Sequence, residues 1–157
     1  MVRPTVEIIP FASHHRSAFK ALNIAWLTKY FVVEPIDEEI LSAPDNILQS
    51  GGHIFMARHG DNIVGTCSLL NAGNRQFELS KMAVDEQFQG MGIGRQLLEA
   101  AVQRYRDYPD HELFLETNSL LQPAINLYES VGFRHAPRPD GPSHYARANV
   151  YMIYNPS

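Results

Sequence analysis

Three glycines at alternate positions, Gly90, Gly92 and Gly94, stand between a predicted strand and a predicted amphipathic helix. Glycine adopts positive φ and, having no Cβ, lets a ligand approach the main chain closely. The first amides of a helix have no partner within the helix and lie at the positive end of its dipole. Residues 89–95 therefore predict a phosphate or diphosphate site, the alternative being a helix start whose glycines only permit close packing.

The spacing of these glycines excludes two familiar phosphate loops. A dinucleotide fingerprint has its third glycine three positions after the second, and counted from Gly92 that position is Arg95. A P-loop continues from its last glycine with Lys and Ser or Thr, whereas Gly94 is followed by Arg95 and Gln96. Neither nucleotide-binding fold is predicted.

Strand and helix periodicities alternate along the rest of the chain. The expected elements are a strand over 5–11, a helix from 13, a short helix over 37–43, strands over 53–58, 63–70 and 77–84, a helix over 92–107, a strand over 113–117, a helix over 123–131 and a strand over 149–154. The apolar face of the first helix is expected to contain Phe19, Leu22, Trp26 and Tyr30. The order β-α-α-β-β-β-α-β-α-β predicts one mixed α+β domain, 1–157, in which a meander precedes a crossover.

Composition narrows the classes of partner. Hydrophobic residues make up 45% and charged residues 19%, which is typical of a folded domain. A net charge of −4 predicts neither a nucleic-acid nor a membrane partner, and no signal peptide or membrane-spanning stretch is recognised. The single cysteine, Cys67, indicates a reducing compartment, for which the cytoplasm is the expectation, and it is predicted to be a small buried residue. The seven histidines show no zinc-binding spacing, so no metal is predicted.

Two segments of the chain resemble the GNAT superfamily of acyl-CoA-dependent N-acyltransferases. Gln89, Gly92 and Gly94 match its signature of Gln or Arg, two residues, Gly, one residue, and Gly or Ala. Residues 78–88 and 124–133 also look like motifs of that family. The resemblance implies the family's mostly antiparallel, splayed sheet flanked by helices.

The resemblance also implies acetyl-CoA as cosubstrate. Its diphosphate would lie on the main chain of the glycine turn, and its pantetheine arm would pair with a strand edge as an added strand. The implied contacts are Met82, Ala83, Val84, Gln89, Gly90, Met91, Gly92, Ile93, Gly94, Arg95 and Gln96. Arg95 is equally well explained as a solvated surface residue. Many family members carry a pantetheine-binding asparagine where this chain has Leu121, and Asn118 is a weaker candidate for that contact.

Two side chains are candidates for acid–base chemistry on the thioester. By the resemblance, Glu78 takes the place of a glutamate base, and strand parity puts Glu78, Ser80, Met82 and Val84 on one face unless a bulge intervenes. Tyr128 takes the place of a tyrosine that protonates the departing thiolate. The structural alternatives are a solvated strand acid for Glu78 and a core aromatic for Tyr128. A backbone amide near residues 82–84 would stabilise the developing oxyanion.

The acceptor is expected to be a small-molecule amine or a peptide amine. Its walls would come from the first two helices, where Trp26, Tyr30 and Phe31 offer an aromatic wall or pack in the core, and from the loop before the last strand. Basic residues near Tyr145 would favour an acceptor with a carboxylate or phosphate if they cluster in space, and otherwise form a solvated loop: Arg134, His135, Arg138, His144 and Arg147.

The predicted function is N-acetyltransferase activity through direct attack in a ternary complex. The alternative is a non-catalytic acyl-CoA-binding or regulatory module. An exposed apolar edge strand near the C-terminus could support a homodimer.

Overall fold

The computed structural model describes residues 5–139, 141, 143 and 145–156. Within them, seven strands form one sheet in the order β1-β2-β3-β4-β5-β7-β6, and β4 and β5 are its parallel pair. The strands are β1 (Glu7–Pro10), β2 (His53–His59), β3 (Asn62–Gly73), β4 (Gln76–Val84), β5 (Glu112–Thr117), β6 (Phe133–His135) and β7 (Val150–Tyr154). The mixed, mostly antiparallel fold predicted from the sequence is confirmed.

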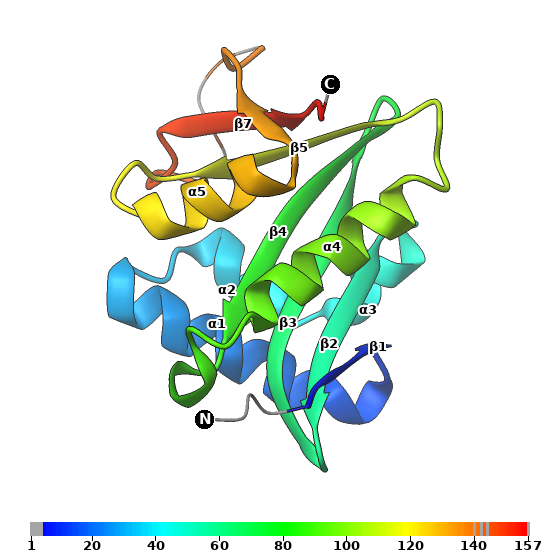
Figure 1. The fold of residues 1–157 in the computed structure, drawn as a ribbon, viewed down its shortest axis with the longest axis vertical. Helices are drawn as coiled ribbons and strands as arrows, with labels where there is room; N and C mark the ends of the chain where they lie inside the picture. Colours follow the sequence, from blue (N-terminus) through cyan, green and yellow to red (C-terminus); the bar gives the residue numbers. More distant parts are fainter. Residues whose placement is uncertain (1–4, 140, 142, 144, 157) are drawn as a thin grey trace.

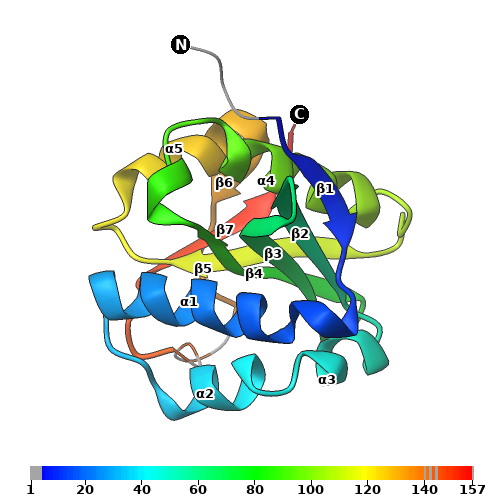
Figure 2. The same ribbon diagram turned by 90° about the horizontal axis from the view of Figure 1, so that it is seen from below.

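Helices cover both faces of this sheet. The helices are α1 (Arg16–Tyr30), α2 (Pro35–Leu41), α3 (Pro44–Gln49), α4 (Ile93–Tyr105) and α5 (Gln122–Val131), with 3₁₀ turns η1 (Ser13–His15) and η2 (Glu86–Phe88). Figure 2 shows α4 and α5 on one side of the sheet and the first three helices on the other. One apolar cluster packs beneath α4 and α5, and a second lies between the sheet and α1 to α3.

The first helix buries a different face from the one predicted. Its buried residues are Phe19, Asn23 and Leu27, while Tyr30 is 41% exposed. Asn23 is tolerated inside because its side-chain amide donates to the carbonyl of Phe19, at 3.0 Å. The buried stripe therefore includes a polar residue that a search for apolar periodicity passes over.

Two elements were not expected from the sequence. The second helix ends at Leu41, before the Pro44 predicted to end it, and Pro44 instead begins α3, because proline suits the first turn of a helix. After Gly132, at φ 126°, the chain turns back and forms β6 against β7. The last strand predicted, over residues 149–154, is not at the sheet edge: β7 lies between β5 and β6, and the C-terminal edge strand is the three-residue β6.

Candidate active site

The sheet opens where β4 and β5 part. They pair from Gln76 and Glu112 to Leu79 and Leu115, and the rest of β5 pairs only with β7. Beyond Leu79 the two strands diverge, as Figure 1 shows. The main chain of β4 from Ser80 to Val84 therefore has no strand partner on its β5 side, which is the edge that an extended arm needs.

The glycine turn lies between the end of β4 and the start of α4. Gly90 and Gly92 have φ of 77° and 82°, values that favour glycine. A Cβ built on Gly90 would meet nothing within 4 Å, so the space above this residue is open. Gly94 is already helical, and a Cβ there would be in ordinary contact with Leu127 of α5, at 3.6 Å. The turn thus offers open main-chain approach at Gly90 and packing at Gly94.

The amides at the start of α4 are available to an anion. The helix begins at Ile93, and its first helical hydrogen bond runs from the amide of Gln96 to the carbonyl of Gly92, at 3.2 Å. The amides of residues 93–95 come before that bond and have no partner within the helix. Ile93 buries its side chain in the core, which leaves its main chain for any ligand. Arg95 donates to Ser130 Oγ on α5, at 2.7 Å. These residues fit a diphosphate through amides and the helix dipole.

A bulge in β4 changes the parity expected from the sequence. Thr66 pairs with Ala83 and Ser68 with Ser80, so Lys81 and Met82 together stand opposite Cys67. Lys81 takes φ of 53° there. Met82 and Val84 consequently pack on the α4 side with Phe77 and Leu79. The prediction that Glu78 shares their face fails because the bulge that would break parity is present.

Glu78 lies on the opposite face and borders a cavity. The side chain is 9% exposed, and no described residue donates a hydrogen bond to its carboxylate. Burial raises the pKa of Glu78 to about 7, against the opposing effect of the Lys81 charge. The alternative of a solvated strand acid is therefore excluded, and the group can change charge near neutral pH.

Tyr128 borders the same cavity from α5. Its ring packs edge-to-face on Phe133, with centroids 6.0 Å apart, and contacts the core cluster, so its packing role is real. Burial raises the pKa of Tyr128 above its ordinary value, which keeps the phenol protonated. Its hydroxyl has no hydrogen-bond partner in the described part of the chain. Tyr128 is therefore both a core aromatic and a free donor at the cavity.

Asn118 is largely committed to the loop that follows β5. Its Nδ2 donates to the carbonyl of Arg147 at 2.6 Å, and its Oδ1 accepts from the amide of Leu120 at 2.8 Å. Leu121 and Asn118 both border the cavity. Asn118 keeps one N–H for other contacts, and the pantetheine contact stays a prediction.

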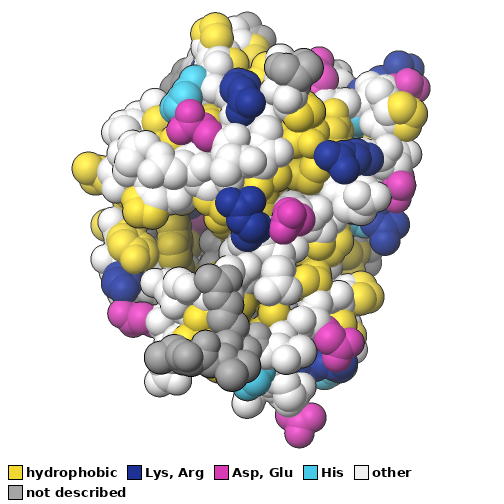
Figure 3. All heavy atoms as spheres, in the orientation of Figure 1, with side chains coloured by type: hydrophobic (Ala, Val, Ile, Leu, Met, Phe, Trp, Pro, Cys, Tyr) yellow, Lys and Arg dark blue, Asp and Glu magenta, His cyan; other side chains and the backbone are white. Residues whose placement is uncertain are grey.

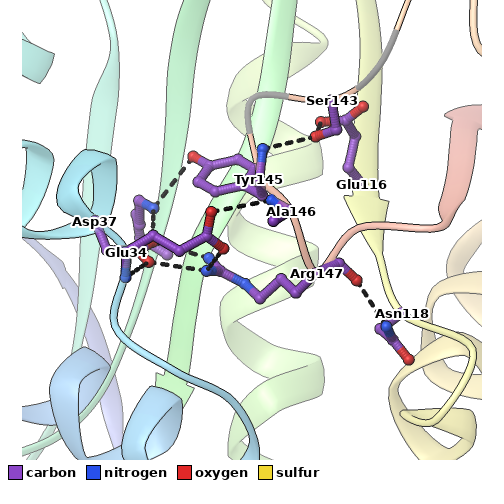
Figure 4. A network of polar contacts seen from close by, with 9 residues as sticks. Glu34, Asp37, Glu116, Asn118, Ser143, Tyr145, Ala146 and Arg147 are labelled. Atoms are coloured by element: carbon purple, nitrogen blue, oxygen red, sulfur yellow. Dashed lines mark hydrogen bonds and ion pairs between the residues drawn. The ribbon is translucent and has the colours of Figure 1, made fainter.

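A buried ionic network that the sequence did not reveal closes the far side of the cavity. Asp37 of α2 is fully buried, and Arg147 reaches both of its carboxylate oxygens at 2.8 Å. Lys81 Nζ lies 3.2 Å from Asp37 Oδ1 and 3.2 Å from the hydroxyl of Tyr145. Glu34 accepts from Arg147 at 2.9 Å and from the amide of Ala146 at 3.0 Å. Figure 4 shows Glu34, Asp37 and Arg147 pointing toward one another beside Tyr145.

Burial and the neighbouring charges shift the pKa values of the members of the network. Burial opposes ionisation of Asp37, but hydrogen bonds from Arg147 and the Glu34 amide and the charge of Lys81 outweigh it and hold its pKa below the ordinary value. Burial lowers the pKa of Lys81 despite the neighbouring Asp37. Burial and the charge of Glu78 raise the pKa of Tyr145, so this phenol stays protonated.

The described basic residues of the late loop do not form a free cationic patch. Arg147 is paired with Asp37 and Glu34, and Arg138 is paired with Glu116. Arg134 Nη1 donates to the carbonyls of Glu129 and Phe133, and the exposed His135 lies on the edge strand β6. His144 lies outside the described residues.

The predicted aromatic wall is formed in part. Trp26 and Phe31 border the cavity, with ring centroids 5.7 Å apart. The ring centroid of Tyr30 lies 5.4 Å from that of Trp26, and Tyr30 borders a neighbouring groove instead. Two of the three aromatic residues thus shape the candidate acceptor side.

Other sequence expectations concern residues away from this cavity. Cys67 is fully buried as predicted, and burial raises the pKa of its thiol to about 12. In the described ranges, no three His, Cys, Asp or Glu residues are grouped to hold a metal ion. None of the helices described there is both long and apolar enough to span a bilayer.

A splayed sheet, a glycine turn at a helix start and a cavity between them define the class of acyltransferase folds. The family model described as "Acetyltransferase (GNAT) family" matches residues 19–133, and the chain belongs to this family. Among curated proteins, the mouse "Probable N-acetyltransferase family 8 member 5" is 30% identical over 111 residues, covering 68% of this chain and 49% of that protein. Rat "N-acetyltransferase 8" is 34% identical over 89 residues, covering 54% of this chain and 40% of the rat protein. The chain spans about half the length of these curated relatives or less.

Solved structures share the fold. A GNAT-family acetyltransferase of Staphylococcus aureus superposes with a TM-score of 0.86 at 23% identity, covering 98% of this chain and 100% of the other. The Salmonella typhimurium protein yncA, described as a putative acetyltransferase with its cofactor acetyl-CoA, superposes with a TM-score of 0.74 at 18% identity, covering 95% and 92%. At these identities the likeness concerns architecture.

Proposed function

We propose that this chain is an N-acetyltransferase that transfers the acetyl group of acetyl-CoA to a primary amine by direct attack in a ternary complex. The observation that carries the proposal is Glu78. It is a buried carboxylate without a hydrogen-bond donor among the described residues, and it shares a cavity with the phenol of Tyr128.

The cosubstrate site consists of main chain. The open space at Gly90 and the amides that start α4 would hold the diphosphate, and the free edge of β4 from Ser80 to Val84 would pair with the pantetheine arm. Structural neighbours described with acetyl-CoA or coenzyme A, from Salmonella typhimurium and Thermoplasma acidophilum, support this assignment. When bound, acetyl-CoA supplies an activated acetyl thioester.

Two side chains would then move protons. An amine like that of lysine has a pKa of about 10.4, so only about one molecule in 10³ is unprotonated at neutral pH. Glu78 accepts the proton that the nitrogen loses as it bonds to the acetyl carbon. Tyr128 donates a proton to the sulfur as the carbon–sulfur bond breaks. An amide near Met82 to Val84 stabilises the charge that develops on the carbonyl oxygen.

The test combines binding and turnover on the purified chain. Calorimetry with acetyl-CoA and CoA measures cosubstrate binding, and CoA release is followed with polyamines, amino acids, aminoglycosides and peptides. Tyr128→Phe should keep acetyl-CoA binding and lose about 10²-fold or more in kcat. Tyr105→Phe is the matched control, because Tyr105 donates to the carbonyl of His111 away from the cavity, at 2.7 Å, and its loss should leave kcat unchanged.

The two possible failures of this test are distinct. Absence of heat with both CoA and acetyl-CoA would contradict the cosubstrate site itself. Binding without turnover on every amine would contradict the enzymatic proposal and favour the non-catalytic module.

The proposal also covers the kind of substrate, the cellular compartment and the oligomeric state. On the face drawn in Figure 3, basic and acidic side chains are interspersed, which supports a small-molecule or peptide amine rather than nucleic acid as partner. The single buried thiol, Cys67, supports a reducing compartment such as the cytoplasm. Size-exclusion chromatography with light scattering would decide whether a homodimer forms despite the three-residue edge strand β6.

A further inference from the structure

Every described cation at the acceptor side of the cavity is already paired. Lys81 is held by Asp37, and Arg147 is held by Asp37 and Glu34. Glu116, which borders the cavity, is paired with Arg138. The carboxylates of these pairs neutralise the cations, so the described residues leave no positive group free to receive an anionic part of an acceptor.

Glu78 is the acid of this cavity that lacks such a partner. Its carboxylate borders the cavity at 9% exposure and receives no hydrogen bond from a described residue. Together with Glu34, Asp37 and Glu116 it gives four carboxyl groups, against the three cations Lys81, Arg138 and Arg147. Glu34, Asp37 and Arg138 lie behind the lining. The described groups in and around the cavity together therefore carry one more negative than positive charge when Glu78 is ionised and the three cations are charged.

Apolar side chains form much of the remaining wall, beside the uncharged polar residues Asn23, Ser80, Thr117 and Asn118. Trp26 and Phe31 form one wall, and further apolar side chains complete it: Leu27, Leu115 and Leu121. The volume of the cavity is about 90 Å³. The apolar part of this wall favours an apolar body of few carbon atoms.

We propose that the acceptor is a primary amine on a compact apolar body, and that the cavity discriminates against amines bearing a carboxylate or phosphate next to the amino group. The inference rests on the proposed function and names its substrate class. An anionic group in this cavity would lose hydration and would face Glu78 and the acids of the network without a free cation to compensate. The late basic loop therefore does not serve to bind an anionic acceptor.

The experiment compares amines that differ only in the carboxylate. Isoamylamine and leucine share one side chain, and leucinol replaces the carboxylate of leucine with a neutral hydroxymethyl group of similar size. We expect kcat/KM for isoamylamine and for leucinol to exceed that for leucine by at least tenfold. Leucine equal to or better than leucinol would overturn the inference.

A charge variant tests whether the network causes the discrimination. Glu34→Gln keeps an acceptor for the Ala146 amide but removes one negative charge beside Arg147, so the leucinol-to-leucine ratio should fall at least threefold. Glu39→Gln removes the same charge from an exposed position of α2 and should leave the ratio unchanged. Equal ratios in the two variants and the parent chain would contradict the assignment of discrimination to the network.

Binding is measured beside turnover to separate this inference from the proposed function. Calorimetry of leucinol and leucine with the CoA-loaded chain should show at least tenfold tighter binding of leucinol. Tighter binding of leucinol without any acetylation would support the charge preference while contradicting the enzymatic proposal. Equal binding of the two would overturn the inference whether or not acetylation occurs.

Discussion

Glu78 is the residue on which the proposed chemistry depends most directly. Burial raises its pKa to about 7, so the base form appears as the pH rises through that value. We expect log kcat to rise with pH over an acidic limb with a midpoint near 7, and Glu78→Gln to lower kcat by about 10²–10⁴-fold and abolish that limb. Stopped-time CoA release between pH 5.5 and 9 measures both. A limb that persists in Glu78→Gln would assign the titration to another group.

The same shift makes a prediction about stability. Because the folded pKa is above the unfolded value, stability from Glu78 is present below about pH 4.5 and is lost as the pH rises through about 7. Glu78→Gln should therefore be more stable than the parent chain at pH 8, by up to about 3 kcal/mol, with the difference shrinking below about pH 5. Urea unfolding at both pH values measures it. A variant less stable at pH 8 would contradict the buried charge.

Sequence reasoning found Glu78 and Tyr128 but not the residues that surround them. Motif resemblance names residues by their place in a segment, and both lie in recognisable segments. Lys81 and Tyr145 are 64 residues apart and Asp37 and Arg147 are 110 apart, so no local spacing could pair them. The available signal was the cluster of basic residues around Tyr145, of which Arg147 alone enters the network.

At the scale of elements, the glycine turn offers a test with a matched control. Gly90 and Gly73 have φ of 77° and 80°, and a Cβ on either would meet nothing within 4 Å. Alanine at either position should cost about 1 kcal/mol of stability, because a side chain is disfavoured at positive φ. Only Gly90→Ala should weaken acetyl-CoA binding, by at least tenfold in calorimetry, since its Cβ would fill the space proposed for the diphosphate.

Equal loss of binding in both variants would show that the effect is not local to the turn. Equal retention in both would remove Gly90 from the proposed diphosphate site.

The order of elements was largely predictable, and the errors have identifiable causes. The strands and the two longer helices after residue 53 follow clear periodicities, and these were recognised. The helix α3 and the strand β6 are six and three residues long, too short for periodicity to show. The bulge at Lys81 arises from pairing with β3, so it has no signature within β4 itself.

At the scale of the whole molecule, Asp37 joins α2, β4 and the loop before β7. It accepts from Arg147, Lys81 and the amide of Glu34, and it is fully buried. Asp37→Asn leaves two cations without their shared counter-ion, so we expect a loss of about 3 kcal/mol of stability. Asp45→Asn removes an exposed ion pair with Arg16 and should cost less than about 1 kcal/mol. Urea unfolding of both variants measures the two losses, and a larger loss for Asp37→Asn than for Asp45→Asn is expected of a buried network.

The extra residue in β4 has a consequence for how two reactants can meet. A strand of strict alternation would turn the carboxylate of residue 78 and the side chains of residues 82 and 84 toward the same layer of helices. With the additional residue, the acid faces the chamber beneath α1, and the segment leading to α4 faces the other layer. In the proposed reaction, the carboxylate of Glu78 faces the amine and the free edge of the same strand holds the cosubstrate, so that a single strand positions both reactants.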